Sequence, residues 1–127
     1  MPLTRISVPQ HLPARQVRAL ADAVQAGLVS TCKVPVDDRF QLVSRFEADN
    51  MILNPTLGGM ARTADACIVE ITFLQGRTDA HKRALYRCVT DQAVAAGFKA
   101  DDIMIALTEN APIDWTLGQG QAFKGHS

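Results

Sequence analysis

The sequence predicts an α/β fold of the α+β kind, in which duplicated β-α-β units form a four-stranded sheet with two helices on one face. Three observations predict this fold. A pattern of signals occurs twice at a nearly constant offset, each copy has two short apolar runs around an amphipathic segment, and 127 residues suit one compact domain. The repeat is clearest where Arg-Ala-Leu at 18–20 returns at 83–85 and Asp-Asp at 37–38 returns at 101–102.

The repeat divides the single predicted domain, 1–127, into four parts. The apolar stretch around Ile6 returns around Ile71, at nearly the same offset as the other matches. We expect repeat one at about 2–46, a connection at 47–66, repeat two at about 67–108 and a C-terminal hairpin or tail at 109–127.

The first copy begins with an alternating run at 3–8, whose β-branched residues and period of two predict a strand. A helix is expected next, with Pro13 at its first position. The Asp-Asp pair predicts a turn, and residues 40–46 predict the second strand. The helix presents one apolar stripe at helical spacing, formed by Val17, Leu20, Ala21, Val24 and Leu28.

The second copy repeats this order. Residues 67–73 predict a strand, and Thr78 is placed to cap the N-terminus of the following helix. Residues 103–108 predict the last strand after the second Asp-Asp turn. Since strand, helix and strand normally give two parallel strands with a right-handed connection, the two copies build one sheet with both helices on one face.

Two segments lie outside the repeat. The connection is rich in turn signals, Asn54-Pro55 and Gly58-Gly59, and is expected to hold a turn or a short edge strand. The tail has glycines between large apolar residues and predicts a small hairpin that docks on another surface. Because both helices cover one face of the sheet, the other face predicts packing against another subunit, and we expect an oligomer.

Composition excludes several classes of protein. Thirteen Lys and Arg balance thirteen Asp and Glu, so no electrostatic footprint indicates nucleic acid or an anionic membrane as a partner. No stretch approaches the roughly 18 consecutive apolar residues of a membrane span, and no signal-peptide core follows Met1, so we expect a cytoplasmic protein. Cys32, Cys67 and Cys88 lack metal-ligand spacing and are expected to be reduced buried thiols.

Several motifs resemble the tautomerase superfamily. The segment 75–82, Gln-Gly-Arg-Thr-Asp-Ala-His-Lys, follows a predicted strand and is similar to the Gly-Arg-Ser/Thr-Asp segment of the 4-oxalocrotonate tautomerase family. Pro2, directly after Met1, resembles the N-terminal proline that defines this superfamily. The chain is most similar to its fused, double-length members of the malonate semialdehyde decarboxylase type, which it resembles also at 34–41, 62–65, 109–110 and 114–120. The resemblance implies a tautomerase/MIF-like fold and a homotrimer.

The chain departs from the decarboxylase pattern at one point. That pattern has two arginines separated by one residue after the third strand, whereas this chain has Gln75 and Arg77 in those places. The single arginine is also the arrangement of the tautomerase-type segment. Tautomerisation and decarboxylation or hydration therefore both stay open.

The resemblance implies a catalytic role for Pro2 as acid or base. If Met1 is removed, Pro2 presents a secondary amine, and a nearby cation or an apolar pocket lowers the pKa of such an amine because both disfavour its charged form. A neutral proline can move a proton between the carbon and oxygen of an enol, whereas a protonated one can polarise a carbonyl. If Met1 is retained, the amide nitrogen is not basic and this chemistry is lost.

The other implied site residues serve the substrate. Arg77 is expected to bind the carboxylate of a small 2-oxo or 3-oxo acid bidentately at the Pro2 end of the sheet. Asp38 matches the functional aspartate of the decarboxylases, although the duplicated turn with Asp102 explains it equally well. Gln75 could donate a hydrogen bond to the substrate, and Trp115 could wall its pocket, or pack in an interface.

No metal or cofactor is expected. His11, His81 and His126 do not cluster with acidic residues in the sequence, and Gly118-Gln119-Gly120 does not follow the strand that a phosphate loop requires. The leading hypothesis is a cofactor-independent enzyme that tautomerises a small anionic keto or enol acid. The alternatives are malonate semialdehyde decarboxylase or hydratase activity, and a non-catalytic oligomeric binding module on the same scaffold.

Overall fold

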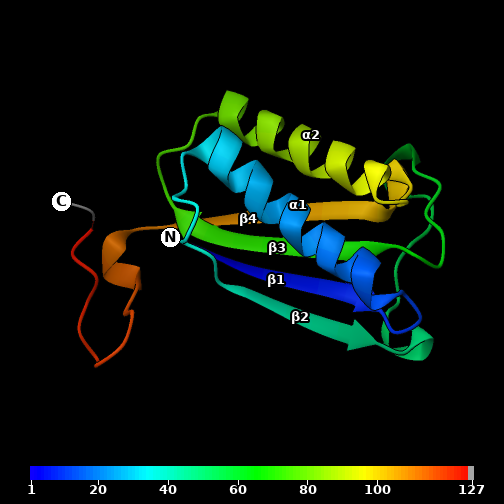
Figure 1. The fold of residues 1–127 in the computed structure, drawn as a ribbon, viewed down its shortest axis with the longest axis horizontal. Helices are drawn as coiled ribbons and strands as arrows, with labels where there is room; N and C mark the ends of the chain where they lie inside the picture. The colour runs from blue at the N-terminus through cyan, green and yellow to red at the C-terminus, as the bar shows by residue number, and fades with distance from the viewer. Residues whose placement is uncertain (126–127) are drawn as a thin grey trace.

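One mixed sheet carries two helices on one face, as the repeat predicts (Figure 1). The computed structural model describes residues 1–125. Its strand order is β2-β1-β3-β4, with parallel pairs β1–β2 and β3–β4 joined by the antiparallel pair β1–β3. The elements are β1 (Pro2–Pro9), α1 (Ala14–Cys32), β2 (Gln41–Phe46), β3 (Cys67–Leu74), α2 (Asp79–Ala95) and β4 (Ile103–Asn110).

The helix starts follow different local chemistry. Pro13 lies one position before the first residue of α1, not at that residue as predicted, because its ψ of 142° is extended while its carbonyl already accepts the Gln16 and Val17 N–H groups. Thr78 caps α2 as predicted, and its hydroxyl accepts the His81 N–H. The His81 ring completes a capping box, since Nδ1 lies 3.3 Å from the Thr78 nitrogen and accepts its N–H.

The core lies between the sheet and the helices. β1 and β3 alternate inward-facing apolar side chains with more exposed ones, as half-covered strands do. α1 and α2 approach closely at Gly27, where an added Cβ would lie 2.8 Å from Val89 Cγ2. Leu20, Leu28 and Phe73 are fully buried in this core.

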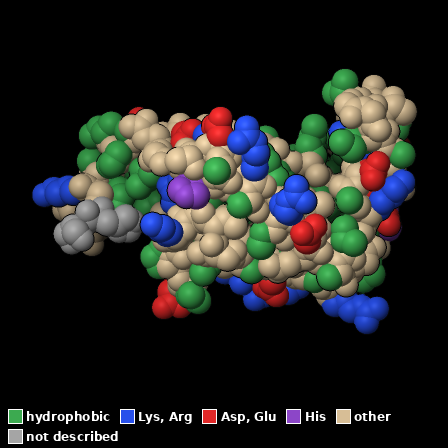
Figure 2. Space-filling model, turned by 90° about the horizontal axis from the view of Figure 1, so that it is seen from above, with side chains coloured by type: hydrophobic (Ala, Val, Ile, Leu, Met, Phe, Trp, Pro, Cys, Tyr) green, Lys and Arg blue, Asp and Glu red, His purple; other side chains and the backbone are tan. Residues whose placement is uncertain are grey.

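The opposite face of the sheet has no helix in front of it (Figure 1). Leu42 on β2 is 50% exposed and Met104 on β4 is 44% exposed, and both alternate with residues that face the helices. Apolar side chains on an uncovered face are typical of a surface that another chain covers. On the face shown in Figure 2, by contrast, basic and acidic side chains are scattered among one another.

The segments outside the repeat are short turns. The connection between β2 and β3 contains two 3₁₀ turns, Ala48–Asn50 and Leu57–Gly59, and it holds no strand. In the tail, Thr116 forms an isolated antiparallel bridge with Ala122, and the Phe123 N–H donates to the Trp115 carbonyl at 2.9 Å. The predicted tail also includes residues 126–127, which lie outside the described residues. Within residues 1–125, neither helix is long and apolar enough to span a membrane.

Candidate active site

The start of β1 lies inside the molecule. Pro2 is buried and pairs with Phe73 of β3, so the first residues of the chain lie at the end of the sheet where β3 leads into α2. The side chain of Met1 is only 9% exposed. Its α-amino nitrogen lies 2.9 Å from Asp38 Oδ2 and forms an ion pair. The structure therefore brings Pro2 and Asp38, two of the predicted site residues, to one place.

The loop before β2 holds Asp38 in position. The side chain of Gln25, on the buried face of α1, donates to the carbonyls of Val36 at 3.3 Å and Asp38 at 3.1 Å. Asp38 Oδ2 meets the chain terminus, whereas Oδ1 is buried and has no hydrogen-bond partner among the described residues. A buried carboxylate oxygen without a donor is costly, and it is the atom at which a donor from a bound molecule would be stabilising.

The sequence repeat does not explain Asp38. Its counterpart Asp102 is 2% exposed and accepts two hydrogen bonds from Thr63, from the N–H at 2.7 Å and from the hydroxyl at 2.5 Å. Asp102 therefore fastens the connection to the second repeat. Asp38 makes no equivalent contact and faces the chain terminus instead, so the two aspartates occupy matching turns with different partners.

A mostly apolar cavity of about 170 Å³ adjoins Pro2. Trp115 forms part of its wall, and its indole N–H donates to Asn110 Oδ1 at 2.5 Å, which fixes the ring relative to the end of β4. The tail thus returns to the start of β1. The other residues of the lining are Met1, Leu3, Phe40, Thr116 and Leu117.

Arg77 lies at the same end of the sheet but lines a neighbouring cavity. Its guanidinium stacks over Phe73 at 4.8 Å from the ring centroid, and Phe73 is the β3 partner of Pro2. Its Nη1 donates to the Leu74 carbonyl at 2.7 Å and its Nη2 to the Cys32 carbonyl at 3.4 Å. Arg77 and Gln75 together line a cavity of about 300 Å³.

The histidines have structural partners in the described part of the chain. His11 Nε2 lies 2.6 Å from Asp65 Oδ1 on the surface, and His81 belongs to the capping box of α2. His126 lies outside the described residues. No cluster of three or more potential metal ligands was found among residues 1–125.

Sequence reasoning missed two features of this site. Gln25 is a polar residue on the apolar stripe of α1, and a polar side chain at a buried helical position is a signal that could have been read. Phe40 was assigned to a strand, but it precedes β2 and lines the cavity beside Pro2. Trp115, by contrast, was named as a candidate wall residue and does line that cavity.

Comparisons with known proteins agree on one family. A family model described as tautomerase enzyme matches residues 38–118. The probable tautomerase YusQ of Bacillus subtilis (strain 168) is 27% identical over 123 residues, which are 96% of this chain and 97% of that protein. The probable tautomerase YrdN of the same organism is also 27% identical, over 96% of this chain and 95% of that protein.

Solved structures extend this agreement to three dimensions. FG41 malonate semialdehyde decarboxylase inhibited by 3-bromopropiolate is 33% identical, with a TM-score of 0.87 over 94% of this chain and 91% of that one. A second malonate semialdehyde decarboxylase is 28% identical, with a TM-score of 0.86 over 94% and 92%. A fused 4-OT, at 20% identity and a TM-score of 0.77 over 94% of both chains, shares the fold.

This chain belongs to the tautomerase family. It is an enzyme of the tautomerase or decarboxylase-like kind, as both the family match and the malonate semialdehyde decarboxylase neighbours indicate.

Proposed function

We propose that this protein is a cofactor-independent tautomerase that uses Pro2 as acid and base on a small 2-oxo or 3-oxo acid. The observation that carries the proposal is the buried ion pair between the Met1 amine and Asp38. If Met1 is removed, the terminal amine moves by one residue to Pro2, at the wall of the apolar cavity. The space that the Met1 side chain fills then joins that cavity.

The remaining site residues would bind the substrate. The planar guanidinium of Arg77 suits a carboxylate, which would replace the backbone carbonyls of Leu74 and Cys32 as hydrogen-bond partners. Gln75, in the same cavity, could donate one further hydrogen bond. Trp115 would exclude water beside Pro2, which strengthens the electrostatic interactions of the reacting groups.

The second candidate function is malonate semialdehyde decarboxylase or hydratase activity. The similarity to two malonate semialdehyde decarboxylases, at 33% and 28% identity over 94% of this chain, supports it. A protonated Pro2 would polarise a substrate carbonyl instead of removing a proton. The Pro2 amine pKa separates the two functions: a value well below about 8 favours the base role, and a higher value favours the acid role.

We further propose that the protein acts as an oligomer, with three subunits as the expected number. The uncovered sheet face with Leu42 and Met104 supports an assembly. One fused 4-OT of the same fold is described as a symmetric trimer. A neighbouring subunit could then close the open side of the cavity beside Pro2.

The test is the ultraviolet rate of ketonisation of phenylenolpyruvate, measured for the protein with its Met1 removed, with malonate semialdehyde as the second substrate. We expect Pro2→Ala to lower the rate by about 10²-fold or more, since general acid–base catalysis contributes a factor of that size. A form with Met1 retained is the matched control, because it keeps every side chain but has no terminal proline. Full activity in the Pro2→Ala variant would refute the proposed mechanism, and no activity of the wild type on either substrate would favour a binding module.

A further inference from the structure

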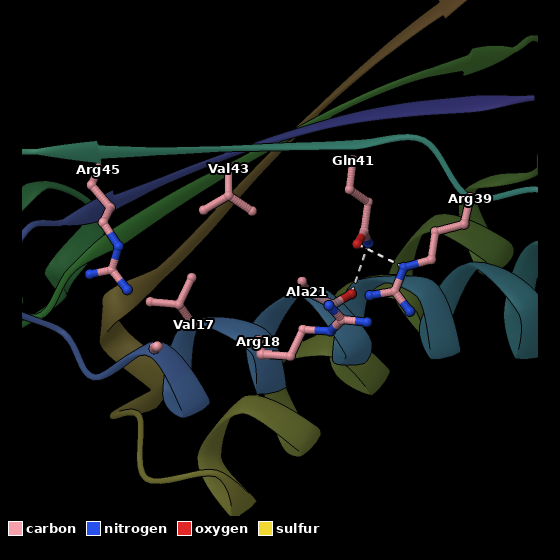
Figure 3. Close-up of a pocket in the computed structure, with 8 residues that line it drawn as sticks. Val17, Arg18, Ala21, Arg39, Gln41, Val43 and Arg45 are labelled. Atoms are coloured by element: carbon pink, nitrogen blue, oxygen red, sulfur yellow. Dashed lines mark hydrogen bonds between the residues drawn. The ribbon is translucent and has the colours of Figure 1, made fainter.

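Another cavity lies away from Pro2, between the first half of α1 and the edge strand β2 (Figure 3). Its volume is about 520 Å³. Three side chains of β2 that face α1, Gln41, Val43 and Arg45, form one wall. Residues of α1 form the other wall, with Val17 opposite Val43, and we call this cavity the α1–β2 groove.

The duplicated fold provides an internal comparison for this groove. Val43 pairs with Ile6 in repeat one, and Leu107 pairs with Ile71 at the matching place in repeat two. Two residues earlier along each strand, Gln41 in repeat one corresponds to Ile105 in repeat two. Ile105 and Leu107 pack against the hydrophobic core and fill the space under α2. Repeat one leaves the same space open and lines it with both apolar and polar side chains.

The charges of the groove are also particular to repeat one. Arg45 pairs with Val8, and the residue that matches it in repeat two is Glu109, which forms an ion pair with Lys82 at 2.6 Å. Arg45 has no carboxylate partner within the described residues. Its Nη1 donates to the carbonyls of Gln10 at 3.0 Å and Leu12 at 2.8 Å, which holds the guanidinium in place.

At the opposite end of the groove, two arginines share one carboxylate. Asp22 accepts hydrogen bonds from Arg39 at 2.7 Å and Arg18 at 3.2 Å. The Gln41 amide is held in place as well, because it accepts from Arg39 and donates to the Ala21 carbonyl, as the dashed lines in Figure 3 show. The groove is therefore positively charged at both ends, and Arg45, next to the apolar pair Val17 and Val43, is the lining arginine that has no carboxylate partner among the described residues.

We propose that the α1–β2 groove binds a small organic anion, namely a carboxylic acid with a short aliphatic body. The carboxylate would accept hydrogen bonds from the Nε and Nη2 groups of Arg45, and the aliphatic body would lie between Val17 and Val43. A guanidinium fixed by other hydrogen bonds loses little entropy when it binds a carboxylate, and the apolar contact adds selectivity over small inorganic anions. This site does not involve Pro2 or Arg77 and does not depend on the proposed function.

The test is titration of the native protein with sodium hexanoate, followed by calorimetry and by the methyl NMR signals of the valines and leucines. We expect a dissociation constant on the order of 1 mM, with shifts centred on Val17 and Val43. Arg45→Ala should weaken binding at least tenfold. Arg15→Ala, on the same helix but outside the groove, is the matched control and should leave binding unchanged.

A second variant keeps Arg45 and its backbone contacts. Val43→Glu places a carboxylate beside Arg45 at a position that is 45% exposed, so it should fold and abolish hexanoate binding. The proposal is overturned if hexanoate does not bind the wild type, if the shifts centre on Leu3 and Leu117, or if Arg45→Ala binds as well as the wild type. It is also overturned if acetate, sulfate or 1-hexanol binds as tightly as hexanoate.

Discussion

At the scale of single residues, Asp38 and Asp102 show how the same turn can serve two purposes. Asp102 has both carboxylate oxygens hydrogen-bonded to Thr63 and almost no exposure, which is the environment of a structural group. Asp38 has one oxygen on the Met1 amine and one oxygen without a partner among the described residues. The first arrangement stabilises the fold, and the second leaves a polar atom available to a bound molecule.

We expect the two aspartates to separate stability from activity. Asp102→Asn should lower the free energy of unfolding by about 1–3 kcal/mol, since a buried charged acceptor of two hydrogen bonds is lost. Asp38→Asn should lower the ketonisation rate by about 10²-fold with a smaller loss of stability. Urea unfolding and the ultraviolet assay measure both quantities. Equal effects of the two substitutions on both quantities would contradict a site role for Asp38.

The cysteines differ in burial. Burial, together with the nearby Asp102 and Asp65 carboxylates, raises the pKa of the Cys67 thiol to about 12. Because the folded state holds this proton more tightly than the unfolded state, with its ordinary value of 9.0, stability should fall as the pH rises from 9 towards 12. All three cysteines are free, as predicted, although Cys88 is only partly buried.

Thiol labelling with a chromogenic disulfide at pH 8 should therefore modify Cys88 first. Cys32 and Cys67, both buried, should react only after unfolding in denaturant. Cys88→Ser is the control and should abolish the fast phase. Rapid labelling of two thiols in the native Cys88→Ser protein would contradict the packing described above.

At the scale of elements, α1 connects the core to the candidate site. The Gln25 side chain projects from the buried face of the helix and donates hydrogen bonds to the loop that carries Asp38. An ordinary apolar residue at this position would pack equally well but would leave the Val36 and Asp38 carbonyls without their donor. The sequence pattern of α1 is therefore interrupted where the helix positions a loop.

Gln25→Leu should lower the free energy of unfolding by about 1–3 kcal/mol, because two carbonyls lose a buried donor. If the loop positions Asp38 for catalysis, kcat should also fall more than KM rises. Gln16→Leu on the same helix is the control, with an expected change within about 0.5 kcal/mol. The assignment is wrong if Gln25→Leu has wild-type kcat together with wild-type stability.

At the scale of the whole molecule, the duplicated unit leaves one face of the sheet uncovered. β2 and β4 alternate, so that Gln41 and Ile105 face the helices while Leu42 and Met104 face away. A charged side chain introduced on that open face would lose its water if the face is buried in an oligomer interface, and this desolvation disfavours assembly. In the monomer the same side chain would stay in water.

Leu42→Glu should therefore shift the protein from its assembled form to the monomer in sedimentation velocity at micromolar concentration. Val94→Glu, at a residue of α2 that is 45% exposed, is the matched control and should leave the assembly intact. Dissociation by Val94→Glu but not by Leu42→Glu would place the interface on the helical side of the molecule instead.

The elements and the parallel pairing within each repeat followed from the sequence, whereas the strand order and the antiparallel pair β1–β3 came from the structure. Period-two runs, an amphipathic stripe and the Thr78 cap are local signals, and a repeat of them restricts the ways in which two β-α-β units can share one sheet. The predicted start of α1 was wrong by one residue, because Pro13 stands just outside the helix with an extended ψ. The motifs at 75–82 and at Pro2 also pointed to the family, which the comparisons show.

The contacts between side chains that are distant in the sequence came from the tertiary structure alone. The ion pair between Met1 and Asp38 joins residues 37 positions apart, and the contact of Arg77 with the Cys32 carbonyl spans 45 positions. The opening of the α1–β2 groove likewise depends on how far β2 lies from α1. Such contacts depend on side-chain rotamers and on the packing of whole layers, which no local period encodes.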